Sequence, residues 1–285
     1  MRTVEKSRRI GLTTVEKVCS CLRLKRDAYY KIKGRLIKQK GTEAKVISLV
    51  KKERETQPRV GTVKLQKHLA DDFFKLGIKM GRDRLFDVLR TNDMLVRRKK
   101  TSFKTTNSYH HFHKYNNLIK DLKITKPNQV WVSDITYIRT VKGFCYLALI
   151  TDLYSRKIVG YDLSDSLELA GCLRALQKAL ANARPAVGLI HHSDRGIQYC
   201  SKQYVEKLTK KKVKISMTEE NHCYENAVAE RVNGILKDEF YLDHHFANTN
   251  HAKKATKSAI SIYNNKRLHL SLNLKTPEKV YRKTA

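Results

Sequence analysis

The chain has 285 residues, of which 41% are hydrophobic, enough for one large domain or for two to three small ones. No run reaches 18 apolar residues and no apolar signal segment opens the chain, so we expect a cytoplasmic protein without a membrane span. The 59 Lys and Arg residues outnumber the 27 Asp and Glu residues, which gives a net charge of +32. Self-repulsion of that size destabilises a compact chain unless a polyanion binds it. The basic residues are spread widely, which favours nucleic acid over a membrane surface.

The six cysteines contain no C-x-x-C pair, which is typical of free thiols in a reducing compartment. His110, His111 and His113 lie close together in the sequence, but no paired cysteines follow them at zinc-finger spacing. We therefore expect no structural zinc site.

The N-terminal part is more basic than the rest, with 34 basic and 12 acidic residues in positions 1–130. Residues 1–41 predict a short helical segment and then a linker, because KGRLIKQKG is basic and bounded by glycines. Residues 42–98 predict three short helices in a helix-turn-helix-like DNA-binding bundle, although a purely structural bundle with a basic surface would show the same pattern. Residues 99–126 are polar and aperiodic, and predict a linker that lies along DNA.

The pattern changes after Pro127. The runs QVWVSDITYIRTV, FCYLALITDL and RKIVGYDL predict three antiparallel strands, with a turn at Lys142 and Gly143 between the first two. A helix over LELAGCLRALQKALANA, a short strand VGLIHHSD, and further helices and a small strand follow. This order predicts an α/β core with a mixed sheet at 127–245, and a C-terminal helix and tail at 246–285.

Three acids in this core lie where carboxylates carry out chemistry. Asp134 is in the middle of an apolar strand, where an unpaired charge is costly; Asp194 follows a strand end, and Glu230 lies on a helix. Two-metal phosphoryl transfer needs about three carboxylates that converge from different elements. These three acids meet that need.

The phase of the helix around Glu230 supports its assignment. At 100° per residue, Asn226, Glu230, Asn233 and Lys237 fall within roughly 60° of one another, and a separate apolar stripe can pack on the sheet. The polar face is therefore free for a substrate, and Lys237 is placed to reach a phosphate.

The run from about Gln129 to Tyr281 resembles the retroviral-integrase-type core of bacterial insertion-sequence transposases. It is most similar to the class whose catalytic protein is encoded by the second of two overlapping reading frames. The matching segments are VWVSDITYI, GFCYLALITDLYSRKIVGYDLS, HHSDRGIQY, CYENAVAERVNGILKDE and YNNKRLHLSLNLKTPEKVY, and the three acids are separated by 59 and 35 residues. Several ordered motifs at these spacings are a far more specific signal than one short pattern.

The resemblance implies a ribonuclease-H-like fold and metal-dependent cleavage at the ends of the element, followed by strand transfer. It implies two Mg²⁺ ions, replaceable by Mn²⁺, held by Asp134, Asp194 and Glu230. The implied partners are double-stranded DNA, further copies of the chain and an upstream-frame protein, near the bacterial nucleoid. We also assign four residues to DNA binding, with bracing of the catalytic helix as the alternative for the last: Lys237, Asn233, Asn226 and Arg267.

Two rival functions remain at this point. A nuclease of the same fold would cut DNA without joining it, and a DNA-binding regulator would carry an inactive core. An incomplete set of acids would favour the regulator, whereas Asp134, Asp194 and Glu230 are all present.

Overall fold

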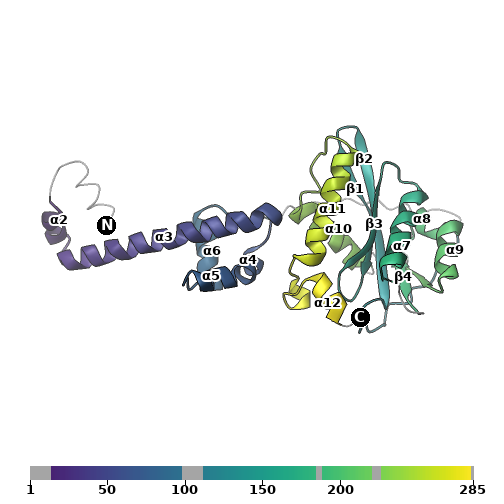
Figure 1. Cartoon of the computed structure of the whole chain (residues 1–285), viewed down its shortest axis with the longest axis horizontal. Coiled ribbons are helices and arrows are strands. Elements are labelled where there is room, and N and C mark those ends of the chain that lie inside the picture. The colour runs from purple at the N-terminus through teal and green to yellow at the C-terminus, as the bar shows by residue number, and fades with distance from the viewer. Residues whose placement is uncertain (1–13, 98–111, 184–187, 220–225, 284–285) are drawn as a thin grey trace. The chain divides into compact units, whose positions relative to one another are not determined.

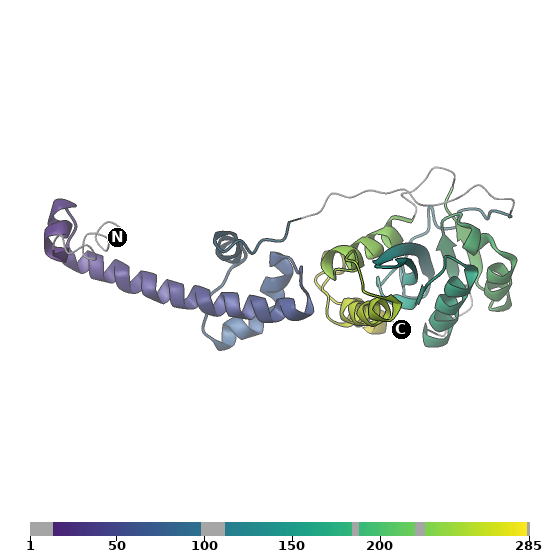
Figure 2. The same cartoon turned by 90° about the horizontal axis from the view of Figure 1, so that it is seen from above.

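The computed structural model describes residues 14–97, 112–183, 188–219 and 226–283. Figures 1 and 2 show its helices and strands along the chain. The chain divides into two compact units, and each is described by itself below. The first unit comprises residues 1–55 and 61–95, and the second comprises residues 56–60 and 96–285.

The first unit is helical, as predicted. Its helices are α2 (Val15–Cys21), α3 (Arg26–Thr56), α4 (Thr62–His68), α5 (Ala70–Lys75) and α6 (Arg82–Thr91). The bundle forms around fully buried aliphatic side chains that recur every three or four residues, as an amphipathic helix requires. They are Val46 and Val50 of α3, Leu65 of α4, and Leu85 and Leu89 of α6.

The linker predicted before residue 42 is wrong, because α3 runs through it without a break. Gly34 and Gly41 both lie inside this 31-residue helix, and neither has a positive φ angle. A glycine costs about 1 kcal/mol in a helix, and the Lys, Arg, Leu and Gln residues between these two are strong helix formers. The predicted boundary at 41/42 therefore falls in the middle of α3.

The second unit contains the predicted mixed sheet, whose strand order is β3-β2-β1-β4-β5. The strands are β1 (Val130–Thr140), β2 (Gly143–Asp152), β3 (Ile158–Ser164), β4 (Ile190–Ser193) and β5 (Lys214–Met217). Strands β1 to β3 form the antiparallel meander, and β4 and β5 extend the sheet in parallel with β1. Strand β1 is therefore central, as its apolar sequence predicts.

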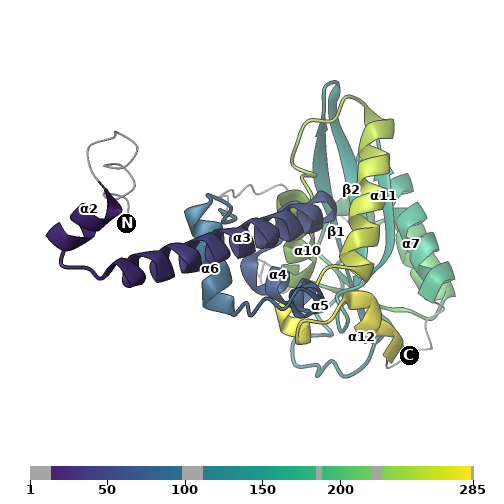
Figure 3. The same ribbon diagram turned by 60° about the vertical axis from the view of Figure 1, so that its left-hand side comes forward.

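Helices cover both faces of this sheet. Figures 1 and 3 place α7 (Leu169–Ala183) on one face, and α10 (Ala227–Glu239) and α11 (Thr249–Asn265) on the other. One core joins Trp131 and Ile150 of the sheet to Leu176 of α7, and another joins Leu147 to Leu236 of α10 and Tyr263 of α11. The remaining helices are short: α8 (Ile197–Cys200), α9 (Lys202–Lys210), the 3₁₀ turn η2 (Leu270–Leu272) and α12 (Pro277–Lys283).

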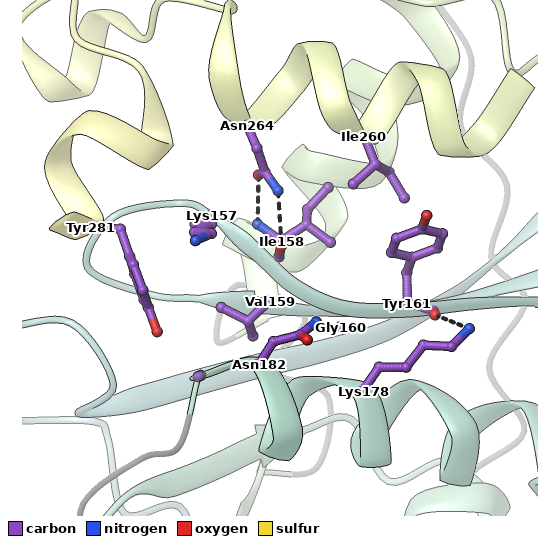
Figure 4. Close-up of a pocket in the computed structure, with 11 residues that line it drawn as sticks. Lys157, Ile158, Val159, Gly160, Tyr161, Lys178, Asn182, Ile260, Asn264 and Tyr281 are labelled. Carbon is purple, nitrogen blue, oxygen red and sulfur yellow. Dashed lines mark hydrogen bonds between the residues drawn. The ribbon is translucent and has the colours of Figure 1, made fainter. Parts of the chain in front are cut away.

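Strand β3 lies at the sheet edge, where unpaired backbone groups invite aggregation. Two side chains cover part of that edge (Figure 4). The Asn264 amide accepts from the Ile158 N–H at 2.9 Å and donates to the Ile158 carbonyl at 2.9 Å, and Lys178 donates to the Tyr161 carbonyl at 3.2 Å. A hollow of about 270 Å³ lies beside these side chains.

Two predicted domain limits need correction. Residues 112–126 were predicted to be a linker along DNA, but Ile119 and Ile124 pack against the apolar cluster of Val130 and Val132. The segment 98–111 lies outside the described residues. No boundary falls at 245 either, since α11 belongs to the core.

Helix α12 is bound back to the start of the sheet. The Lys157 ammonium lies 2.7 Å from the Glu278 carboxylate and 4.2 Å from the centre of the Tyr281 ring. The Asn128 amide donates to the Tyr281 hydroxyl at 2.8 Å, across 153 residues of sequence. The C-terminal residues are therefore integral to the second unit.

Among the residues described, none of the helices is both long enough and apolar enough to span a membrane.

Candidate active site

The register of the parallel strands brings two of the predicted acids together. Ser133 of β1 is paired with Ser193, the last residue of β4, so Asp134 and Asp194 each follow the final pair of that ladder. Beyond this point β1 continues without β4 beside it. The site thus lies where one strand of the sheet ends and its neighbour goes on.

Asp134 receives its hydrogen bonds from neutral groups. Its Oδ1 accepts from the Ile135 backbone N–H at 2.8 Å, and its Oδ2 accepts from the Asn233 side-chain amide at 2.7 Å. Burial among protein atoms, helped by the charge of Asp194 and less strongly by that of Glu230, raises the pKa of Asp134 to about 7 against the effect of the two hydrogen bonds. Asp194 and Glu230 therefore both lie within electrostatic reach of Asp134.

Asp194 is held at the start of α8. Its Oδ1 accepts from the Gly196 backbone N–H at 3.1 Å. A Cβ atom at position 196 would lie 3.0 Å from that same oxygen, which is closer than side-chain atoms normally approach. Glycine at 196 thus allows the carboxylate to fold back onto the turn.

Glu230 lies on the first turn of α10, and its side chain is exposed. Two asparagines on this helix, seven residues apart, hold it against β1. Asn226 donates to the Ser133 carbonyl at 3.1 Å, and Asn233 donates to Asp134. These two bonds fix the helix that carries Glu230 against the strand that carries Asp134.

Asn226 and Asn233, which the sequence assigned to DNA binding, direct their side-chain amides into the protein. Their side chains are buried, with exposed fractions of 4% and 5% for the two residues, and both donate to β1. Helical periodicity places them on one face with Glu230, and in the structure both of their side chains reach β1 from that face.

Lys237 lies one turn beyond Asn233 and is half-buried. Burial lowers the pKa of Lys237, and the nearby charge of Asp134 opposes that effect. Arg139 also lowers it, which places this exposed guanidinium within electrostatic reach of the same cluster. Arg139 was not predicted from the sequence; its position at the end of the Asp134 strand is the signal that could have found it.

Arg267, for which the sequence left DNA binding and bracing of the catalytic helix as alternatives, pairs with a residue of that helix. Its guanidinium forms two hydrogen bonds with the Glu239 carboxylate, at 2.6 and 2.7 Å, and the Arg267 side chain is only 4% exposed. Glu239 is the last residue of α10. Arg267 therefore braces the C-terminal end of the helix that carries Glu230.

Other polar residues nearby have structural partners. Buried Asp152 accepts from the backbone N–H groups of Asn128, Tyr154 and Ser155 at 3.0 to 3.2 Å. His191 Nε2 lies 2.7 Å from the Ser133 hydroxyl, and burial lowers the pKa of His191 to about 3, which keeps the ring neutral. These contacts account for the polar groups of Asp152 and His191 without a ligand.

The chemistry of the acid cluster fits a divalent cation. Carboxylate oxygens are the ligands that Mg²⁺ prefers, and a bound cation would offset the cost of ionising the buried Asp134 carboxyl beside the charge of Asp194. In the described part of the chain, however, no three His, Cys, Asp or Glu side chains lie close enough together to hold one ion. Exposed Glu230 is the acid with room to move.

Comparison with known proteins identifies the family. Two models of the integrase core domain match residues 124–223 and 211–277. The 31 kDa protein of insertion element IS600 from Shigella sonnei is 39% identical over 226 residues, which cover 78% of this chain and 81% of that protein.

Named transposases match over shorter stretches. The IS629 transposase of Shigella sonnei is 38% identical over 50% of this chain and 48% of its own length. The IS904 transposase of Lactococcus lactis is 37% identical over 57% of this chain and 65% of its own length. Among solved structures, the magnesium-bound catalytic core of HTLV-2 integrase covers 56% of this chain and 99% of its own, at 20% identity and a TM-score of 0.46. The chain thus belongs to the bacterial insertion-sequence transposases.

Proposed function

We propose that this transposase cuts DNA at the ends of its insertion sequence and joins the freed 3′ hydroxyl to a second strand, with Asp134, Asp194 and Glu230 as the catalytic acids. The observation that carries the proposal is the position of Asp134. It lies on the central strand, beside the end of the strand that precedes Asp194, and the charges of both other acids raise its pKa.

The three carboxylates would hold two Mg²⁺ ions, or Mn²⁺ in their place. When bound, such a pair supplies positive charge to the attacking and leaving oxygens of the phosphodiester. The protein residues do the positioning: Asn233 orients the Asp134 carboxylate, and Asn226 and Arg267 keep α10 in place. Lys237 binds a DNA phosphate beside the acids.

Double-stranded DNA from the element and the target is the proposed substrate, and the net charge of +32 supports it. We further propose that several copies of the chain assemble on the DNA. An upstream-frame protein, joined to this chain or bound to it, supplies the sequence recognition.

The test measures strand cutting and strand transfer on labelled terminal-repeat DNA. Asp134→Asn, Asp194→Asn and Glu230→Gln should each lower both activities by about a thousandfold or more, while DNA affinity changes less than about threefold, because the basic surface supplies that affinity. EDTA should abolish both activities, and Mn²⁺ should restore them.

Glu168→Gln provides the matched control, since Glu168 is exposed and lies outside the acid cluster. Normal activity in any of the three acid variants would disprove the assignment of that acid. Cut DNA without joined product, under conditions in which the 3′ hydroxyl is available, would instead identify a nuclease.

A further inference from the structure

The hairpin formed by β1 and β2 carries aromatic side chains beyond the part of the sheet that α7 covers. In the register of this hairpin, Tyr137 lies opposite Tyr146, and Arg139 lies opposite Phe144. Directly opposed side chains share one face of an antiparallel pair, and successive odd positions of β1 stay on that face. The three rings and Arg139 therefore form one continuous surface.

These rings contact one another and remain accessible. The centres of the Tyr137 and Tyr146 rings are 5.2 Å apart, and those of Tyr137 and Phe144 are 5.9 Å apart, both edge to face. Phe144 is 50% exposed and Val141, in the turn, is 76% exposed. The three rings belong to neither of the two cores described for the sheet. Grouped apolar side chains on a surface mark a binding site.

Positive charge surrounds the rings. Arg139 and Lys142 are both exposed, and the sequence has no acid between Asp134 and Asp152. Arg139 also acts electrostatically on Lys237, which in turn is close enough to feel Asp134. Arg139, on the edge of β1 beyond the end of β4, is therefore within electrostatic reach of the proposed active site, while the rings lie on the α7 face of β1 and Asp134 lies on the α10 face.

We propose that the hairpin surface, defined as Tyr137, Arg139, Lys142, Phe144 and Tyr146, stacks an unpaired DNA base while its two cations bind the adjoining phosphates. Aromatic rings accept any base because every base has a flat apolar face, and arginine adds an attraction of its own. The inference rests on the proposed function, since strand cutting and transfer leave unpaired nucleotides beside the active site.

Charge favours DNA over a second copy of the chain as the occupant. Two copies joined through this surface would bring Arg139 and Lys142 of each chain close together, and like charges at an interface cost several kcal/mol. A DNA strand has the complementary charge, and its bases become available for stacking wherever pairing ends.

The test uses the full chain in EDTA, so that no cutting occurs. The probe is a duplex with a short unpaired overhang that contains 2-aminopurine, compared with the same duplex fully paired. Binding to the wild type should quench the fluorescence of the overhang. Phe144→Ala should remove the quenching and weaken binding to the overhang by about tenfold, as the loss of one stacked base predicts. Affinity for the paired duplex should change less than about twofold.

Two further variants make the result specific. Phe144→Trp keeps a flat ring and should retain the quenching. Leu270→Ala removes an exposed apolar side chain elsewhere in the second unit, 65% exposed in η2, and should leave both readouts unchanged.

Unchanged quenching in Phe144→Ala would overturn the inference. So would a loss of self-association in this variant, measured by sedimentation, while binding to the overhang stays normal, because that result would identify a protein interface. Since the readout needs no catalysis, it is independent of whether the three acid variants abolish cutting.

Discussion

Asp134 is held in surroundings that oppose its ionised form. Burial is the main cause, the Asp194 charge is second, and together they raise the pKa of Asp134 to about 7 in the folded protein from an ordinary value of 3.8. At a pH between these two pKa values, the Asp134 carboxyl has lost its proton in the unfolded chain but keeps it in the folded protein. The stability of the folded state therefore falls as the pH rises through this range, and the loss is complete above pH 7.

Asp134→Asn should consequently stabilise the metal-free protein at pH 8. The variant gives up one of two hydrogen bonds, about 1 kcal/mol, but removes a cost with an upper limit of about 4 kcal/mol. Thermal unfolding in EDTA at pH 5 and at pH 8 measures this, with Glu168→Gln as the control. The melting temperature of Asp134→Asn should exceed that of the wild type by more at pH 8 than at pH 5. If the two proteins differed in melting temperature by the same amount at pH 5 and at pH 8, the folded protein would not raise the pKa of Asp134.

At the scale of elements, the close packing of α7 on β3 depends on one glycine. A Cβ atom at Gly160 would lie 2.4 Å from the Ala175 carbonyl oxygen and 2.6 Å from the Ala179 Cβ, both on α7. Neither neighbour is the flexible end of a long side chain, so the helix would have to move away from the strand.

Gly160→Ala should therefore destabilise the second unit by about 2 kcal/mol or more, as overpacking of a core does. Gly234→Ala is the matched control: Gly234 lies within α10, has nothing within 4 Å of a Cβ, and should gain up to about 1 kcal/mol from its helix propensity. Urea unfolding measures both free energies. An unchanged free energy of unfolding in Gly160→Ala would show that α7 can move away from β3 without loss of stability.

The sheet could be predicted from sequence because each long strand is an apolar run of at least seven residues between turns. The four-residue helix α8 spans barely one helical turn and shows no periodicity. Gly34 and Gly41 suggested a break in the helix, but the strong helix formers between them keep α3 continuous. For the site, spacing and phase predicted three acids, of which Asp194 and Glu230 lie within electrostatic reach of Asp134, whereas the partners of Asn226 and Arg267 depend on tertiary contacts that a helical period does not encode.

At the scale of the whole molecule, the excess of basic residues in positions 1–130 predicts that most DNA affinity is electrostatic. Cations spread over phosphates position a duplex without reading its bases. We expect the isolated chain to bind its terminal repeat less than about tenfold better than a scrambled duplex, with affinity that falls steeply as salt rises. Competition binding with both duplexes at several salt concentrations measures this.

A preference of about a thousandfold for the terminal repeat over the scrambled duplex would contradict this prediction, because specific recognition reaches that level. Such a result would show that the helices at 42–98 read bases themselves and that the chain needs no upstream partner for recognition.

The bond between Asn128 and Tyr281 has a consequence for how the protein is made. A ribosome adds about 5 to 20 residues per second, so the 153 residues between these two partners take roughly 8 to 30 s to synthesise. The helices of the first unit find their contacts nearby in the chain and can form during that time. Strand β1 instead leaves the ribosome long before α10, α11 and α12 have been made. Its apolar face therefore stays uncovered on the nascent chain during that time. The second unit therefore cannot complete its fold until the last residues of α12 have been synthesised.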